Sequence, residues 1–283
     1  MPVPRLFEVP AEPAQQWVHT LSCLLELGGI ETRAALLAEL TGEEIPDAGS
    51  ATVREQRRLG AVEADVVVRD AGRRWAVAVW STLGFDVDAE GVLAALHDGL
   101  AGDGRALVVA LTPDRRPPAA VERARAGGRD VRHRSWLRVR DWVQERPERG
   151  QARGTDLLLL TEAEYFLTPR VAELYRLEYL MPRLPEALRP MLATVFFDLN
   201  DLAPAPLIER VDRVAFPRTG EPKVELILDG AGLAVRLATT REGPGFAPDG
   251  PGWTALRVSD PAQYVAARSF VRSAARELLP ARL

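Results

Sequence analysis

Hydrophobic and polar positions alternate with two different periods along the first half of the chain. Three short segments, 64–69, 75–80 and 106–111, are almost wholly apolar and rich in valine and alanine, which predicts strands buried on both faces. Segments with apolar residues three and four positions apart lie between and around them, and predict helices that cover the sheet. The helices predicted in this way are 11–27, 31–40, 89–100, 119–126 and 135–144, and two more polar strands are predicted at 51–59 and at Val131.

A polar, glycine-containing segment, 146–154, is the predicted linker to the second half. The patterns beyond it predict helices at 161–179, 184–199 and 261–279, a hairpin of strands 223–228 and 233–239, and a strand at 254–258. The fold class expected from this order is α/β. A mixed sheet flanked by helices is expected over residues 1–146, followed by a smaller α+β domain or extension over 155–283.

Composition narrows the class of protein further. With 47% hydrophobic and 27% charged residues, the chain can bury a large core and is typical of soluble globular proteins. No apolar run approaches the roughly 20 residues of a membrane helix, and the first 13 residues lack the basic and hydrophobic segments of a secretory signal. A single cysteine, Cys23, is expected in a helix core and excludes a disulfide framework or a cysteine-built zinc site. We therefore expect a cytoplasmic protein with no membrane partner.

Charge is distributed unevenly although its sum is only −4. Residues 1–104 contain 8 Arg and 17 acidic residues, whereas residues 105–153 contain 13 Arg and 6 acidic residues. Lys223 is the only lysine, a bias typical of a GC-rich bacterial genome, so individual arginines need not indicate phosphate binding. The imbalance nevertheless predicts a basic surface on the segment 105–153. The acidic residues Glu43, Glu44 and Asp47 are expected to be solvated.

A candidate catalytic carboxylate stands in the first buried hairpin. Asp65 opens the strand 64–69, Asp70-Ala71-Gly72 forms the turn, and the strand 75–80 returns. With this order of elements, residues 11–144 resemble the PD-(D/E)XK nuclease superfamily, whose core is a helix, a three-stranded meander, a second helix and a fourth strand. Glu63-Ala64-Asp65 matches its first motif, and Ser135-Trp136 is similar to an ending found in some bacterial relatives.

The resemblance implies Mg²⁺ held by two carboxylates and a lysine that polarises the attacking water. In the place of the (D/E)-x-K triplet this chain has Ala78-Val79-Trp80, which supplies neither an oxygen ligand nor a cation. Glu63 and Glu55 are the possible substitutes beside Asp65, so the candidate catalytic residues are Asp65, Glu63 and Glu55, with Asp65 as a metal ligand if the protein is active. No cofactor is expected unless it is an active, magnesium-dependent enzyme. A structural alternative is that Asp65 only caps a strand end.

Arginines in the segment 115–153 alternate with Trp136 and Trp142, a combination suited to phosphate contact and base stacking. The spacing of Trp136, Val139 and Val143 predicts an inward-facing apolar stripe, with Arg134, Arg138 and Arg140 facing outward. The residues predicted to bind nucleic acid are Arg115, Arg116, Arg134, Arg138 and Arg140. The histidines His19, His97 and His133 lack metal-ligand spacing, and no P-loop, nucleophile elbow or H-E-x-x-H motif occurs.

Three functions follow as hypotheses. The first is a catalytically inactive nuclease-like protein that binds DNA or RNA, or a partner that processes nucleic acid. The second is an active metal-dependent nuclease with relocated catalytic residues. The third is a non-enzymatic interaction or structural subunit, with a protein partner or a second copy of itself. The degenerate triplet favours the first over the second.

Overall fold

The computed structural model describes residues 13–279 except 86, 179, 201, 203–206, 211, 217–220 and 230–231. The chain forms two compact units that divide between Glu173 and Leu174. The division falls within the long helix α6 (Gly154–Leu177), which begins seven residues before the helix predicted at 161–179. The predicted start of the first helix at Ala11 lies outside the described residues.

The first unit contains a five-stranded mixed sheet in the order β1-β2-β3-β4-β5. The strands β1 to β3 form an antiparallel meander, and β3, β4 and β5 run parallel to one another. The bounds of these strands are β1 Thr52–Leu59, β2 Val62–Arg69, β3 Ala76–Ser81, β4 Ala106–Thr112 and β5 Val131–Ser135. All five lie where the sequence pattern predicts strands, so the α/β class and the flanked mixed sheet are confirmed. The assignment to a restriction-endonuclease-like fold stays a prediction.

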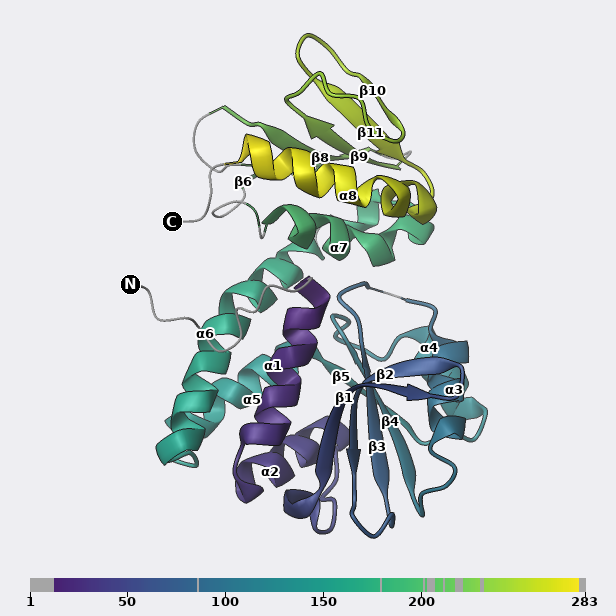
Figure 1. Cartoon of the computed structure of the whole chain (residues 1–283), viewed down its shortest axis with the longest axis vertical. Coiled ribbons are helices and arrows are strands. Elements are labelled where there is room, and N and C mark those ends of the chain that lie inside the picture. The colour runs from purple at the N-terminus through teal and green to yellow at the C-terminus, as the bar shows by residue number, and fades with distance from the viewer. Residues whose placement is uncertain are drawn as a thin grey trace. The chain divides into compact units, whose positions relative to one another are not determined.

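Helices cover both faces of this sheet, as its apolar strands require (Figure 1). On one face, α3 (Glu90–Gly99) and α4 (Ala119–Ala126) pack their buried side chains against small residues of the central strands. The other face is covered by α1 (Pro13–Leu27), α2 (Ile30–Thr41) and α5 (Trp136–Glu148). Both faces of β3 and β4 are consequently closed to water.

The covering helices α1, α5 and α6 are joined by aromatic contacts. The Trp17 and Trp136 rings meet edge to face with centroids 4.8 Å apart, and Phe166 lies 6.5 Å from Trp17. Trp136 also donates a hydrogen bond from Nε1 to the Thr82 carbonyl at 3.1 Å. Trp136 is 1% exposed, so the inward-facing stripe predicted for this helix is confirmed and this tryptophan is not available for base stacking.

The hydroxyl side chains of the three parallel strands occur at their carboxyl ends. Ser81 ends β3, Thr112 ends β4 and Ser135 ends β5, and Thr112 is in register with Ser135. Since helices enclose both faces of β3 and β4, polar side chains of these two strands can reach a ligand only at this edge. Ligands of open α/β sheets bind outside the carboxyl ends of the strands for the same reason.

The second unit is built around a six-stranded antiparallel sheet in the order β10-β11-β9-β8-β7-β6. Its strands are β6 Leu207–Arg210, β7 Arg213–Phe216, β8 Val224–Asp229, β9 Gly232–Leu237, β10 Phe246–Pro248 and β11 Thr254–Val258, and its helices are α7 Arg189–Asn200 and α8 Pro261–Leu278. Two short 3-10 turns, 181–183 and 186–188, precede α7, so the predicted helix 184–199 begins later than expected. The predicted hairpin is confirmed, while β6, β7 and β10 were not predicted.

A buried carboxylate ties α7 to α8 within the second unit. Asp198 on α7 accepts hydrogen bonds from Tyr264 Oη at 2.9 Å and from Arg268 Nε and Nη2 at 2.6 and 2.9 Å. Arg272 Nη1 lies 3.6 Å from the same carboxylate. Burial, reinforced by the Asp198 charge, raises the pKa of Tyr264. This network satisfies a charge that would otherwise be costly to bury.

We expect Asp198→Ala to lower the free energy of unfolding by about 3 kcal/mol, because it leaves the two arginines without their buried counter-charge. Tyr264→Phe removes one hydrogen bond and is expected to cost about 1 kcal/mol. Urea denaturation followed by circular dichroism measures both. Equal losses in the two variants would contradict a charge-based role for Asp198.

Among the residues that the structure describes, no helix is both long and apolar enough to cross a membrane.

Candidate functional site

The predicted catalytic aspartate lies within β2 and faces the end of β3. Asp65 Oδ2 accepts hydrogen bonds from the Ser81 backbone N–H at 2.5 Å and from Ser81 Oγ at 3.0 Å. Burial raises the pKa of Asp65, the two Ser81 hydrogen bonds oppose that shift, and the charges of Glu63 and Glu55 add to it. The carboxylate thus holds the carboxyl end of β3 to β2, which agrees with the structural alternative of a strand-end cap.

The neighbours of Asp65 differ in kind from those of an active nuclease. Ala78 is fully buried in the core under α3, and Trp80 packs against the same core. Glu63 and Glu55 are exposed, and Glu55 lies 3.5 Å from His19 Nδ1 on α1. Between the register pairs Glu55–Val66 and Arg57–Ala64, Gln56 adopts a left-handed φ of 48°. The charges of Glu63 and Glu55 therefore act on Asp65, but the carboxylates have different neighbours: Ser81 binds Asp65, and His19 lies beside Glu55.

The residues present do not fit the magnesium site that the family resemblance implies. Ala78 and Trp80 supply no oxygen ligand beside Asp65, and Ser81 already donates two hydrogen bonds to Asp65 Oδ2. Within the described part of the chain, no group of three His, Cys, Asp or Glu side chains could hold a metal ion.

If Asp65 is a structural cap, Asp65→Ala should lower the free energy of unfolding by about 2 kcal/mol, because the Ser81 N–H loses a charged acceptor. Ser81→Ala removes only the hydroxyl bond and should cost about 1 kcal/mol. Chemical denaturation measures both losses. Glu63→Ala, at an exposed position of the same strand, is the control, and an Asp65→Ala loss no larger than that of the control would contradict the cap.

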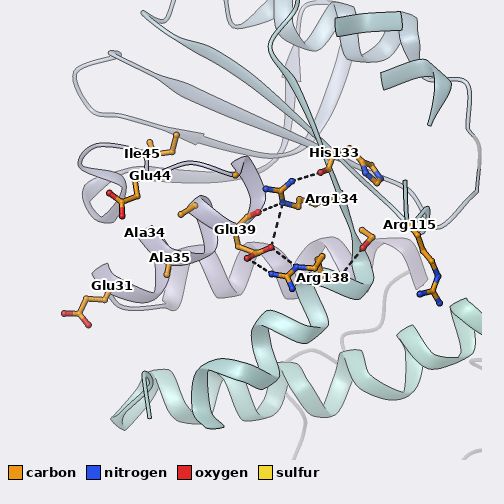
Figure 2. Close-up of a pocket in the computed structure, with 13 residues that line it drawn as sticks. Glu31, Ala34, Ala35, Glu39, Glu44, Ile45, Arg115, His133, Arg134 and Arg138 are labelled. Carbon is orange, nitrogen blue, oxygen red and sulfur yellow. Dashed lines mark hydrogen bonds and ion pairs between the residues drawn. The ribbon is translucent and has the colours of Figure 1, made fainter. Parts of the chain in front are cut away.

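A second polar site lies at the carboxyl ends of β4 and β5, where a pocket of about 1000 Å³ opens between α2, α5 and the loop after β4 (Figure 2). We call it the arginine pocket. Its lining residues are Glu31, Ala34, Ala35, Ala38, Glu39, Gly42, Glu44, Ile45, Arg115, His133, Arg134, Ser135 and Arg138. It contains Arg115, Arg134 and Arg138, three of the five arginines predicted to bind nucleic acid.

Glu39 on α2 is the centre of the interactions in the arginine pocket (Figure 2). Arg138 binds its carboxylate with two hydrogen bonds, Nε to Oε1 at 3.1 Å and Nη2 to Oε2 at 3.1 Å. Arg134 Nε donates to the Glu39 backbone carbonyl and lies 3.9 Å from Oε1, while its Nη1 donates to the His133 carbonyl at 2.9 Å. Both guanidinium groups thus converge on one carboxylate, although they come from a strand and a helix.

Local backbone features position these two arginines. Ser135 caps α5, and its Oγ accepts a hydrogen bond from the Arg138 backbone N–H at 3.3 Å. Gly42 ends α2 with a left-handed φ of 81°, and a Cβ at this position would lie 2.6 Å from Arg134 Nη2. Because Gly42 has no side chain, the guanidinium of Arg134 can occupy this space.

The other predicted arginines have different surroundings. Arg140 is largely covered and pairs with the adjacent Asp141, with Nη2 2.5 Å and Nε 2.9 Å from Oδ1. Arg115 and Arg116 are exposed on the loop after β4, and Arg115 reaches the pocket wall. The expectation that Arg134, Arg138 and Arg140 face outward holds for Arg138, which is 50% exposed, but not for Arg134 at 27% or Arg140 at 22%.

His133 closes the floor of the pocket and is almost completely buried. Its Nε2 lies 3.0 Å from Thr112 Oγ1, which in turn is 2.9 Å from Asp114 Oδ2. Burial lowers the pKa of His133 to about 4, and the charges of Arg125 and Arg134 add to the shift. The histidine is therefore neutral near pH 7 and contributes no charge to the pocket.

The lowered pKa of His133 makes folding depend on pH. In the unfolded chain the imidazole has its ordinary pKa of 6.5 and takes up a proton that the folded protein excludes until about pH 4. The stabilisation is complete above pH 6.5 and is lost as the pH falls toward 4, by about 3 kcal/mol. His133→Gln should lose less stability than the wild type between pH 7 and pH 4 in urea titrations. His97→Gln is the control, and an identical pH slope in His133→Gln and wild type would contradict this reading.

Several arginines of the basic segment pair with carboxylates of the acidic first third. Arg105 Nη2 lies 2.7 Å from Glu43, and Arg123 lies 2.7 Å from Asp88 and 2.5 Å from Glu90. Glu43, predicted to be solvated, is instead paired. Pairing within the folded unit thus offsets part of the charge imbalance along the sequence.

The sequence prediction missed Glu39, Ser135 and His133 as residues of this pocket. Glu39 lies 95 residues before Arg134, and no local motif relates the two. The opposite charges of residues 1–104 and 105–153 were the available signal, because they favour pairing between the two segments. The positions of Glu31 and Glu39 along α2 do not show which of these two carboxylates pairs with Arg134 and Arg138.

No protein-family model, curated protein or solved structure matches this chain. The resemblance to the PD-(D/E)XK nucleases consequently stays a prediction from the residues and the order of the elements.

Proposed function

We propose that this chain is a catalytically inactive, nuclease-like protein that binds nucleic acid through the arginine pocket. The observation that carries the proposal is that Arg134 and Arg138 meet at Glu39 in one pocket at the carboxyl ends of β4 and β5, and that Arg115 also lines this pocket. Guanidinium groups bind phosphate oxygens through paired hydrogen bonds, as Arg138 already binds a carboxylate. The pocket volume of about 1000 Å³ is at the upper end of the range for small-ligand sites and leaves room for a nucleotide.

The surroundings of Asp65 support the absence of catalysis. Its carboxylate accepts two hydrogen bonds from Ser81, and the positions that would carry a second carboxylate and a lysine carry Ala78 and Trp80. Arginine could not replace the missing lysine easily, because its guanidinium stays protonated and is not tuned as an ammonium is. The hairpin of β2 and β3 is therefore part of the scaffold, and the arginine pocket is the part that binds nucleic acid.

Fluorescence anisotropy with a labelled single-stranded oligonucleotide and its duplex, at about 50 to about 200 mM salt, tests the binding role. We expect Arg138→Ala to weaken binding roughly tenfold, because a charged hydrogen-bond donor to phosphate is lost. It should also reduce the slope of log affinity against log salt by about 0.7 to 0.9. Arg149→Ala, at the C-cap of the same helix and ion-paired with Glu145 at 2.9 Å, is the control.

Two outcomes would contradict the proposal. The absence of binding to either oligonucleotide at low salt would remove the nucleic-acid role and favour a protein partner or a second copy of the chain. Cleavage of the oligonucleotide with Mg²⁺ or Mn²⁺ that disappears in Asp65→Ala would favour the active metal-dependent nuclease instead.

A further inference from the structure

Three arginines on the edge strand β1 differ from those of the arginine pocket. Arg54, Arg57 and Arg58 are all exposed, and none of them has a carboxylate partner among the described residues. Arg58 Nε donates only to the Gly60 carbonyl, at 3.2 Å. In the described part of the chain β1 pairs with β2 and with no other strand, so its outer side is an open edge of the sheet. An anion can therefore reach these arginines without displacing a carboxylate of the protein.

The backbone of β1 places two of these arginines on the same face of the sheet. Side chains three residues apart in a regular strand point to opposite faces. In β1, however, Arg54 is in register with Val67 and Arg57 with Ala64, and both partners belong to the buried cluster under α3. Since directly opposite residues share a face, Arg54 and Arg57 both lie on the α3 side of the hairpin.

Gln56, between the two arginines, accounts for this change in the alternation. Its left-handed φ of 48° interrupts the regular strand, and this conformation is strained for a residue other than glycine. The strain is located between the two residues whose side chains it aligns. Strained residues of this kind occur preferentially at binding sites and active sites.

The glutamates of the hairpin lie on its other face. Glu55 points toward α1, where its carboxylate is 3.5 Å from His19 Nδ1. Glu63 and Arg58 are directly opposite each other, and each is adjacent in sequence to a residue of the α3 face, so both point away from that face. The other two arginines of β1 therefore place two positive charges on the α3 side that neither glutamate neutralises.

We propose, on the basis of the function proposed above, that Arg54 and Arg57 form a second contact surface for the nucleic-acid backbone. This surface is separate from the arginine pocket, because β1 and β5 are opposite edges of the sheet. Guanidinium groups bind phosphate oxygens, and each arginine that meets a phosphate releases condensed counterions. Contacts of this kind position the nucleic acid and do not read its base sequence.

The open edge of β1 suits a phosphate backbone better than an added strand of a partner protein. A partner strand needs a regular row of backbone groups along the edge, and the left-handed residue Gln56 interrupts this row. A second copy of β1 would bring like charges together, because residues 54–58 include three arginines and one glutamate. Nucleic acid is therefore the partner that both the charges and the backbone favour.

Fluorescence anisotropy with the same single-stranded and duplex oligonucleotides measures the contribution of each arginine. We expect Arg54→Gln and Arg57→Gln each to weaken binding by about threefold to tenfold at low salt, and to reduce the slope of log affinity against log salt by about 0.7 to 0.9. Arg58→Gln removes the same charge from the same strand but from the other face, so it should change the affinity by less than about twofold. All three positions are exposed, so the variants should unfold in urea like the wild type.

Wild-type affinity and salt slope in both Arg54→Gln and Arg57→Gln would overturn the β1 surface, and would leave the proposed function standing if Arg138→Ala still weakens binding. An equal loss in Arg58→Gln would also overturn the surface, because it would indicate a general effect of charge. If Arg138→Ala binds like the wild type while Arg54→Gln and Arg57→Gln are weakened, the role of the arginine pocket is overturned and the β1 surface stands. Competition by polyglutamate at the affinity of the oligonucleotide would identify an acidic polypeptide as the partner and overturn the contact with nucleic acid.

Discussion

The double-sided burial of β3 and β4 determines where the first unit can place polar chemistry. Neither strand has a charged or hydroxyl side chain before Ser81 and Thr112 at its carboxyl end, because helices close both faces. The hydroxyls at that edge are all used: Ser81 binds Asp65, Thr112 lies between His133 and Asp114, and Ser135 caps α5. A buried sheet of this kind concentrates its hydrogen-bonding capacity at one edge, and the arginine pocket is on that edge.

Ion pairing between charged side chains is a second constraint on the first unit, and it follows from the burial of β3 and β4. Since the buried central strands hold no charge, the acidic residues of the first third and the arginines of 105–153 meet on the covering helices, the loops and the edge strand β5. Pairs such as Arg105–Glu43, Arg123–Asp88 and Arg138–Glu39 offset part of the imbalance seen along the sequence. Paired surface arginines contribute little to stability, but they leave few guanidinium groups free to attract a polyanion at long range.

The elements of the first unit were predictable because each buried strand is a continuous apolar run and each helix has an apolar stripe. The weaker predictions concern the second unit. The strands β6 and β7 are only four residues long, and β10 lies in a glycine- and proline-rich segment whose composition resembles a loop. The site was predictable in part. Residue type alone singled out Arg134 and Arg138, but their shared partner Glu39 depends on how α2 packs beside β5, which no local pattern encodes.

Asp65 and Glu39 illustrate how differently two carboxylates can serve one sheet. Asp65 is half-buried and receives two hydrogen bonds from Ser81 on the neighbouring strand, so its oxygen links β2 to β3. Glu39 is on the wall of an open pocket, and the arginines it binds have geometry suited to phosphate as well as to carboxylate. A carboxylate in the first position adds to the scaffold, while one in the second is open to solvent. The sequence resemblance directs attention to Asp65, but the accessible pocket directs the functional hypothesis to Glu39 and its arginines.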